Sequence, residues 1–483
     1  MEISIIDMFR DGVVFITGST GFLGKILLEK LLRSCDVKTI AVFVRGKKGL
    51  TASQRTADIY KQTTFDRLRL EKPDFITKIK IIDGNLEEPS LGFSTDDRDW
   101  LIKNVNFLFH CAATVRFNET LQIATKINIQ GTENILELAT KMTNLKGFVH
   151  VSTAYSHCPR SEIKEQFYPV SISANELKDL IKRDKNTQNF SVDWPNTYTF
   201  TKAISENLIL TNENQLPISI FRPSIIGCTK CEPEPGWLDN INGPSGIIAP
   251  LIVGFLRTFQ LSMDKRADIV PVDYTANALI SVMWSTVNSY EKNKEPTIYN
   301  YVSSVESSIH WDKIIQYVFE TYHQAPPLGS MWFIFCIFST NRWFIDILRF
   351  LLHRIPAAFV DLSFIIRGKN PKMLKMYKKL ENTTDLLKVF TTSEWKFDNS
   401  NIQELWSLLS QEDRETFWFS FKEFDWKSYI KCTVYGIRKH ILHEELSNMT
   451  IALKKNQKLF WCHQLCIFFI IYIVFQVCWM FVA

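Results

Sequence analysis

The chain has 483 residues, of which 46% are hydrophobic and 22% charged, a composition that excludes disordered, collagen-like and coiled-coil proteins. The length predicts two or three domains. The net charge of +5 comes from 56 basic and 51 acidic residues. It lacks the strong positive excess of nucleic-acid binding proteins, so we expect no nucleic-acid partner. The aromatic fraction of 13% fits an aromatic core, a large apolar ligand or a membrane surface.

Ten cysteines in a chain of this length do not form a disulfide scaffold, so we expect a reduced protein that faces the cytosol. Cys228 and Cys231 have the spacing of a metal or redox pair, but no second pair or nearby histidine completes a zinc site. We therefore expect no metal. Glu2, Asp7 and Arg10 lie in the first turns, and no long apolar core or cleavage site follows them. The sequence therefore predicts no secretory signal.

Short β-branched apolar runs alternate with amphipathic segments in the first third of the chain. The first run, residues 13–17, is followed by a glycine-rich turn and then by a helix with apolar residues at helical spacing. This alternation is typical of an α/β protein and predicts a Rossmann-type doubly wound parallel sheet with helices on both faces. The further elements that we expect are a helix at 121–139 and strands at 39–44, 79–82, 106–110 and 147–152.

The pattern changes after about residue 285, where helical periodicity predicts a mainly helical C-terminal region. Met331–Phe338 and Trp343–Leu352 are apolar blocks too short to span a membrane alone. They predict buried helices, with an aromatic-rich hairpin inserted into one leaflet as the alternative. Arg367–Lys379 contains six basic residues and no acidic one, which fits a solvated face or contact with anionic headgroups.

The last 19 residues, Leu465–Ala483, carry no formal charge and are long enough to cross a bilayer as one helix. Lys454, Lys455 and Lys458 precede this segment, and cationic flanks favour the cytosolic side. We therefore predict a single C-terminal transmembrane helix with the body of the protein in the cytosol, and the choice between the endoplasmic reticulum and the peroxisome is left open. The alternative is an apolar helix packed against the protein's own core.

A dinucleotide site is predicted between the first strand and the first helix, where glycines follow GxxGxxG spacing. Gly18 allows a tight turn, Gly21 lets the backbone approach a pyrophosphate, and Gly24 lets helix and strand pack closely. Backbone N–H groups at the helix start then face the phosphates. The other residues of this turn that we expect to contact the cofactor are Thr20, Phe22 and Leu23.

The end of the second predicted strand indicates which dinucleotide is bound. A carboxylate there favours NAD, whereas an arginine accommodates the 2′-phosphate of NADP. The sequence has Arg45 in a short basic segment without a carboxylate. It therefore predicts NADPH as the cofactor with Arg45 as the phosphate ligand, and the alternative is a basic loop tip in solvent.

Tyr198 and Lys202 are four residues apart, so on a helix they share one face. A free phenol has a pKa near ~10, and a close ammonium stabilises the phenolate and lowers that pKa. Such a pair can pass a proton to a carbonyl oxygen as hydride arrives. Ser152 and Thr153 follow a predicted strand, and a hydroxyl there could hydrogen-bond the substrate oxygen beside Tyr198.

These motifs together resemble the extended short-chain dehydrogenase/reductase superfamily, and further segments resemble the fatty acyl-CoA reductases in particular. The similarity extends over nearly the whole chain, with the motifs in order. The segments that carry it are residues 18–24, 109–113, 127–132, 152–153, 198–202, 221–227, 234–246, 267–273, 353–357 and 425–438.

The resemblance implies an enzyme that reduces a long-chain fatty acyl-CoA to a primary alcohol with two NADPH. CoA is released, and a hemithioacetal and an aldehyde stay bound in between. It implies Tyr198 and Lys202 as the proton-transfer pair and Thr153 as the carbonyl-binding hydroxyl, with Ser152 as the rival. The predicted domains are a NADP-binding Rossmann reductase domain (1–290), a helical fatty acyl-CoA reductase C-terminal domain (291–460) and a tail anchor (461–483).

The resemblance also implies cofactor contacts from Ala112 and Arg222 and a helix-anchoring or relay role for Asn128. Asn85 departs from the superfamily pattern, which usually has an acidic residue at the adenine, but an amide can still hydrogen-bond adenine. Two alternative functions are a sterol or other lipid dehydrogenase of the same superfamily and a non-catalytic NADP-binding membrane scaffold. The intact Tyr198, Lys202 and Thr153 argue against a scaffold. A homodimer is left open.

Overall fold

A computed structural model of the chain describes residues 3–47, 49–183, 193–211, 216–291 and 294–482. It divides into two compact units, and each unit is built from three separate segments of the sequence that alternate with those of the other. The first unit comprises Met1–Pro235, Asp268–Ser308 and Trp395–Phe424, and the second comprises Gly236–Ala267, Ile309–Glu394 and Asp425–Ala483. The domain boundaries that the sequence predicts, after residues 290 and 460, stay a prediction.

The first unit contains a seven-stranded parallel sheet with the order β12-β7-β5-β4-β1-β2-β3. From β1 the chain runs through β2 to β3 on one side and through β4, β5, β7 and β12 on the other, so the strand order reverses beside β1. The predicted doubly wound Rossmann-type sheet is confirmed. The strands are β1 (Val13–Thr17), β2 (Thr39–Val44), β3 (Ile79–Asp83), β4 (Phe107–His110), β5 (Gly147–Val151), β7 (Ile218–Pro223) and β12 (Thr297–Tyr301).

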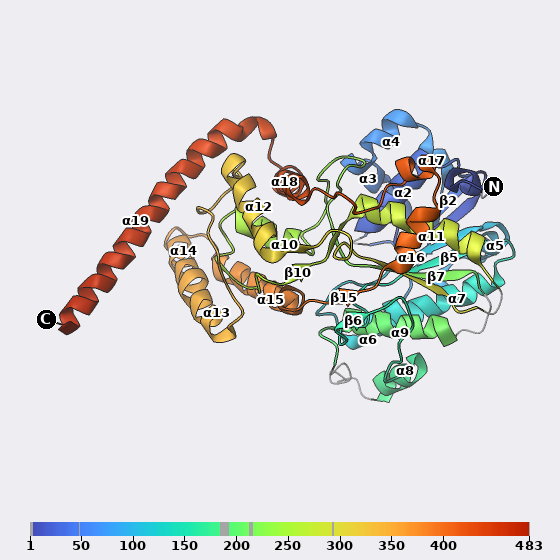
Figure 1. Ribbon diagram of the computed structural model, residues 1–483, viewed down its shortest axis with the longest axis horizontal. Coiled ribbons are helices and arrows are strands. Elements are labelled where there is room, and N and C mark those ends of the chain that lie inside the picture. Colours follow the sequence, from blue (N-terminus) through green and yellow to red (C-terminus); the bar gives the residue numbers. More distant parts are fainter. Residues whose placement is uncertain (1–2, 48, 184–192, 212–215, 292–293, 483) are drawn as a thin grey trace. The chain divides into compact units, whose positions relative to one another are not determined.

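Helices cover both faces of this sheet, which explains why its central strands are buried along their whole length. Every residue of β1, β4 and β5 is buried. Figure 1 shows α2 (Phe22–Ser34) and α11 (Val272–Ser289) on one side of the strands. On the other side it shows α7 (Gly131–Lys141) and α9 (Thr197–Thr211).

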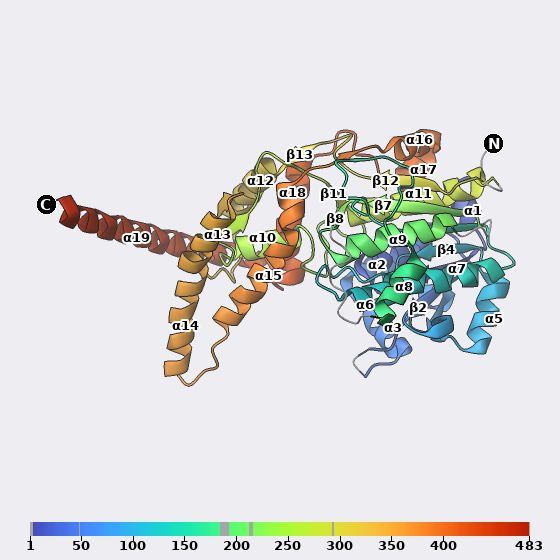
Figure 2. The same cartoon turned by 90° about the horizontal axis from the view of Figure 1, so that it is seen from below.

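The second unit is mainly helical, as predicted. Its short strands β9 (Thr258–Gln260) and β14 (Ile337–Ser339) pair in parallel. In Figure 2, α14 and α15 run side by side and are joined by a turn. The longer helices are α10 (Ser245–Ile252), α12 (Trp311–Gln324), α13 (Arg342–Arg349), α14 (Ile355–Ile366), α15 (Met373–Thr392), α18 (Trp426–Gly436) and α19 (Met449–Val482).

The prediction of a buried helix at Met331–Phe338 is wrong. This segment is a loop that enters β14, and its backbone bonds go to the chain beside β9: Met331 N donates to Val253 O at 2.8 Å, and Ile337 N to Arg257 O at 3.0 Å. An apolar run of eight residues does not by itself distinguish helix from strand. Trp343–Leu352 is helical, but most of its large apolar side chains are exposed.

Among the described residues, α19 is the one helix that is long and apolar enough to cross a membrane. Its most apolar window has a mean hydropathy of 1.9, and none of that window is buried. The helix begins well before the apolar tail, and its first half packs within the second unit. There the indole of Trp332 donates to His463 Nδ1 at 3.1 Å, and the Phe335 ring stacks on the same imidazole.

Candidate active site

The glycine turn joins β1 to α2 at the carboxyl edge of the sheet, where ligands bind in doubly wound folds. Gly18 has a φ of +75°, and a Cβ there would lie 2.7 Å from the backbone nitrogen of Ala112. A Cβ on Gly24 would overlap the carbonyl oxygen of Gly18. Close packing therefore requires both glycines, and it sets Ala112 directly beside the turn.

Gly21 differs from these two glycines because it is exposed and serves as the N-cap of α2. Its N–H donates to Gly18 O at 2.9 Å, and no side chain caps the helix there. Phe22 opens the helix, and Leu23 is buried under it. A helix start without a capping side chain presents backbone N–H groups to an anion. The turn therefore fits a pyrophosphate.

Arg45 follows β2 and Asn85 follows β3, so the adjacent strands bring the two side chains together. Arg45 Nη1 donates to Glu87 Oε1 at 2.5 Å and to Asn85 Oδ1 at 3.3 Å. Arg55 of α3 (Ala52–Tyr60) donates to the carbonyl of Arg45 at 2.8 Å and to Thr20 Oγ1 at 3.0 Å. Two guanidinium groups therefore lie beside the glycine turn. Burial and the charge of Arg45 lower the pKa of Arg55.

Arg55 was not among the predicted site residues. It lies in a helix that follows the second strand, and no local pattern distinguishes it from the other basic residues near it. Only the fold brings it between Thr20 and Arg45.

Tyr198 and Thr153 meet at the carboxyl end of β5. Tyr198 lies in the first turn of α9, with the Thr153 hydroxyl beside its phenol. Burial raises the pKa of Tyr198 to about 12, and the Thr153 hydroxyl only partly opposes the rise. The phenol is therefore protonated at neutral pH and can act as a proton donor.

Lys202 lies one turn after Tyr198 and is buried. Its ammonium donates to the carbonyl oxygen of Val151 at 2.7 Å, and burial lowers its pKa to about 8. The pKa of Tyr198 is raised, with burial as the largest cause, so the expected lowering by this ammonium is not observed.

Ser152 takes a different partner from its neighbour. Its hydroxyl donates to a carboxylate oxygen of Glu206, which lies one helical turn beyond Lys202 on α9. Of the two rival hydroxyls, Thr153 is therefore the one that contacts Tyr198. Ser152 belongs to a buried cluster behind it.

Glu206 is the centre of that cluster. Arg222 donates to its two oxygens at 3.0 and 2.7 Å, and His157 Nε2 lies 3.0 Å from Oε2. Burial alone would raise the pKa of Glu206, but Arg222 and His157 hold it well below its ordinary value. Arg222 is 0% exposed, and its other donors reach the carbonyls of Lys164 and Gln166. These contacts favour a positioning role for Arg222 over the predicted cofactor contact.

Asn128 connects α9 to the loop after β4. Its amide nitrogen donates to Thr201 Oγ1 at 2.9 Å and to Thr114 O at 3.2 Å, while its oxygen accepts from Thr114 N at 2.8 Å. One bond reaches the buried face of α9 beside Lys202, and the other two hold the backbone of Thr114 in the loop. They support the helix-anchoring role expected for Asn128.

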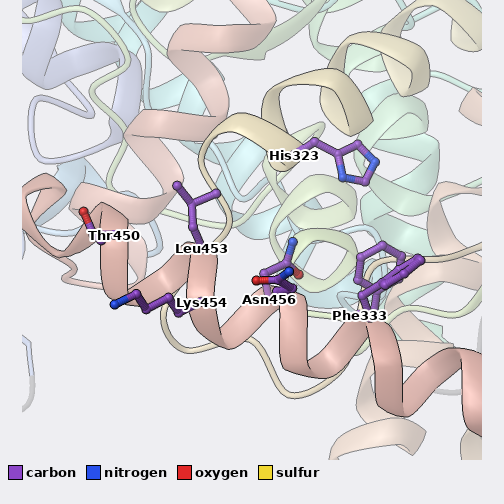
Figure 3. A pocket seen from close by; sticks show the side chains of 8 residues that line it. His323, Phe333, Thr450, Leu453, Lys454 and Asn456 are labelled. Carbon is purple, nitrogen blue, oxygen red and sulfur yellow. The ribbon is translucent and has the colours of Figure 1, made fainter.

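A separate cavity of about 490 Å³ lies in the second unit, between the end of α12 and the first turns of α19. Figure 3 shows side chains from both helices around it. None of the predicted site residues lines it within the described part of the chain. The residues labelled there are His323, Phe333, Thr450, Leu453, Lys454 and Asn456.

The sheet, the glycine turn and the hydroxyl pair define a Rossmann-fold oxidoreductase that uses a nicotinamide dinucleotide. Two family models, both described as Male sterility protein, match residues 16–279 (the NAD-binding part) and 352–444 (the Sterile part). Fatty acyl-CoA reductase wat of Drosophila melanogaster is 38% identical over 458 residues, which cover 93% of this chain and 88% of the relative. Fatty acyl-CoA reductase 1 of Homo sapiens is 36% identical over 465 residues, which cover 95% and 90%. The chain belongs to the fatty acyl-CoA reductase family.

A solved structure supports the fold over most of the chain. The terminal R domain from the myxalamid PKS-NRPS biosynthetic pathway has a TM-score of 0.63 at 19% identity and covers 90% of this chain and 93% of its own. A UDP-glucuronic acid 4-epimerase from Bacillus cereus in complex with NAD reaches a TM-score of 0.51 at 14% identity, covering 89% and 98%. The protein is a fatty acyl-CoA reductase and an NAD(P)-dependent oxidoreductase.

Proposed function

We propose that the protein reduces long-chain fatty acyl-CoA to the primary fatty alcohol with NADPH and releases CoA, through a bound aldehyde. The observation that carries this proposal is the Thr153–Tyr198 hydroxyl pair beside Lys202 at the carboxyl edge of the sheet. The relatives named fatty acyl-CoA reductase support the substrate class.

The residues at the glycine turn fit a dinucleotide phosphate. Gly18 and Gly24 pack without room for a side chain, and Gly21 is exposed at the start of α2. Arg45, which pairs with Glu87, and Arg55 place two guanidinium groups where the 2′-phosphate of NADPH is expected. When bound, NADPH supplies hydride to the acyl carbonyl carbon, and two such reductions convert the thioester to the alcohol.

The chain's own residues then handle the substrate oxygen. Tyr198 is protonated at neutral pH, so its O–H can donate a hydrogen bond and then a proton to the oxygen that gains charge. The Thr153 hydroxyl orients the phenol and can share the same oxygen. Lys202 is fixed on Val151 O, where its positive charge lies behind the developing negative charge.

The test is product analysis with the full-length chain in detergent, given palmitoyl-CoA and either NADPH or NADH. We expect hexadecanol and CoA thiol in equal amounts, with two NADPH consumed for each thiol, and slower turnover with NADH. Accumulation of hexadecanal as the final product would contradict the alcohol-forming reaction. Oxidation of a sterol without turnover of the acyl-CoA would favour the lipid dehydrogenase.

We also infer that α19 anchors the protein with its body in the cytosol. The apolar half of α19 is exposed along its length, and Lys454, Lys455 and Lys458 precede it on the same helix. Cationic flanks favour the cytosolic side, where NADPH and acyl-CoA are available.

The anchor is tested by a chain that ends at Gln464, which keeps the packing of His463 on Trp332. The full-length chain should stay with the membrane pellet after an alkaline carbonate wash, and the shortened chain should be released. Retention of the shortened chain would show that α19 is not the sole anchor.

A further inference from the structure

Large apolar side chains are exposed along one stretch of the second unit, from α13 through a π-helical turn (Phe350–Arg354) into α14. Trp343 is 83% exposed, Phe359 69% and Ile366 77%. Soluble surfaces rarely carry so many contiguous apolar groups. We call this stretch, residues 342–366, the apolar face. Its other large exposed members are Phe344, Ile347, Phe350, Leu351, Leu362 and Ile365.

Asp361 is the only acidic residue of α14, and it does not point into solvent. It is 5% exposed, and its carboxylate accepts backbone N–H bonds of 2.8 to 2.9 Å from Lys372, Met373 and Leu374 at the start of α15. This arrangement joins α14 to α15 and satisfies the carboxylate internally. The outer side of α14 is left with apolar side chains.

The charges on α13 are paired with one another. Asp346 accepts from Arg342 at 2.8 Å and from Arg349 at 3.4 Å. Arg342 and Arg349 also bind Asp385 of α15, and Arg349 is buried. The helix can therefore present Trp343 to an apolar phase without leaving an unpaired charge beside it.

Basic residues begin where the apolar face ends. From 362 to 380 the chain has no acidic residue, and its six basic side chains are all exposed. Figure 2 shows this segment at the turn between α14 and α15 and along α15. They are Arg367, Lys369, Lys372, Lys375, Lys378 and Lys379.

The combination identifies the partner as an anionic lipid surface. Side chains such as Phe359 and Ile366 gain by entering the boundary between headgroups and acyl chains, while flanking lysines attract anionic headgroups. A second copy of the chain fits less well, because a symmetric contact would bring two basic segments of equal sign together. The second unit also carries α19, the membrane-span candidate.

We propose that the apolar face lies in the interfacial layer of the bilayer that α19 enters, with the basic residues 367–379 on anionic headgroups. The protein then has two attachments, a spanning tail and an in-plane helix. This proposal does not depend on the catalytic assignment, but it does rest on the α19 anchor.

The experiment uses the full-length chain in vesicles, with the photoreactive residue benzoylphenylalanine replacing Phe359. A matched control carries the same residue in place of Trp418, which is 43% exposed in the first unit. Phospholipid adducts after illumination should be at least about tenfold more abundant at position 359 than at 418. Equal yields at the two positions would overturn the proposal, as would adducts between two copies of the chain.

The headgroup contact is tested by comparing vesicles of phosphatidylcholine with an equimolar mixture of phosphatidylcholine and phosphatidylserine. Phosphatidylserine should raise the adduct yield at position 359, and the triple variant K369Q/K372Q/K375Q should abolish that rise. An unchanged yield would overturn the role of the basic residues. A chain that does not float with vesicles would overturn the anchor and the apolar face together, whereas floating without adducts would overturn the apolar face alone.

Discussion

The two units depart from ordinary burial in opposite directions. The first unit buries Glu206 and Arg222, groups that most proteins keep in water, whereas the second exposes Trp343 and Phe359, groups that most proteins bury. In the first unit, Glu206 and Arg222 form an ion pair. In the second unit, the charged side chains near the exposed apolar groups have their own partners, as when Asp361 accepts backbone N–H bonds. Both departures lie in the parts of this chain for which we propose contact with a ligand or a membrane surface.

The largest effect should come from Tyr198, the group that we propose as the proton donor to the substrate oxygen. Replacing Tyr198 with Phe removes the proton donor and should lower alcohol formation by about 100-fold or more, while NADPH still binds. Turnover with palmitoyl-CoA and a fluorescence titration of NADPH measure the two effects. Tyr290→Phe, at a half-exposed site after α11, is the control and should keep full activity. A Tyr198→Phe enzyme with more than half of normal turnover would remove Tyr198 from the mechanism.

The roles of the Thr153 and Ser152 hydroxyls can be separated by whether their removal lowers kcat or stability. Thr153→Val removes the hydroxyl beside Tyr198 and should lower kcat by about 10- to 100-fold. Ser152→Ala removes a donor to buried Glu206 and should lower stability by about 1–3 kcal/mol. Comparable kcat losses in both variants, without a difference in stability, would contradict the division of roles.

Disrupting the buried cluster around Glu206 should lower the free energy of unfolding. Glu206→Gln keeps the shape of the side chain but leaves Arg222 without its counter-charge, which should cost about 3–5 kcal/mol of unfolding free energy in urea. Glu137→Gln removes an exposed pair with Lys141 on α7, and it should cost less than about 1 kcal/mol. Similar losses for the two variants would argue against the cluster as a support for α9.

The difference in stability between the wild type and Glu206→Gln should depend on pH in a definite direction. Because the folded pKa of Glu206 lies well below its ordinary 4.5, its contribution to stability is fully present above that pH. It is lost as the pH falls through the lower folded value. The stability gap between the wild type and Glu206→Gln should therefore stay constant from neutral pH down to about 4.5 and narrow only below it. Urea unfolding at a series of pH values measures this gap.

A smaller effect is expected at the phosphate ligand. Arg45→Ala should weaken NADPH binding about tenfold, the loss of one charge-assisted contact, and leave NADH binding nearly unchanged. Lys61→Ala, an exposed cation just past the end of α3, is the control. Equal weakening of NADPH and NADH would assign Arg45 to the structure of the loop.

Local patterns in the sequence predicted five of the seven strands of the sheet, and β7 and β12 were missed. The strands at 13–17 and 39–44 match residue for residue, because buried parallel strands appear as continuous β-branched runs. The glycine turn was predictable in part for a similar reason, since Gly24 packs on nearby Gly18, whereas Gly18 itself packs on Ala112 of a distant segment.

Features that depend on distant segments were missed. Glu206, Arg222 and His157 come from three elements, and only the spacing of Glu206 from Lys202 on α9 hinted at a shared face. Arg55 likewise reaches Arg45 only in the folded chain. The apolar block at Met331–Phe338 was assigned to a helix because its pairing partner, β9, lies far away in sequence.

The continuity of α19 has a mechanical consequence. The helix runs from Met449 to Val482, 34 residues, so it is about 50 Å long at 1.5 Å per residue. Its packed half and its exposed half are one rod, and no flexible joint separates His463 from Leu465. A residue inserted between them would turn everything beyond by about 100°. The tail therefore cannot rotate independently of the second unit. It fixes the direction in which the second unit faces as well as its distance from whatever the tail enters.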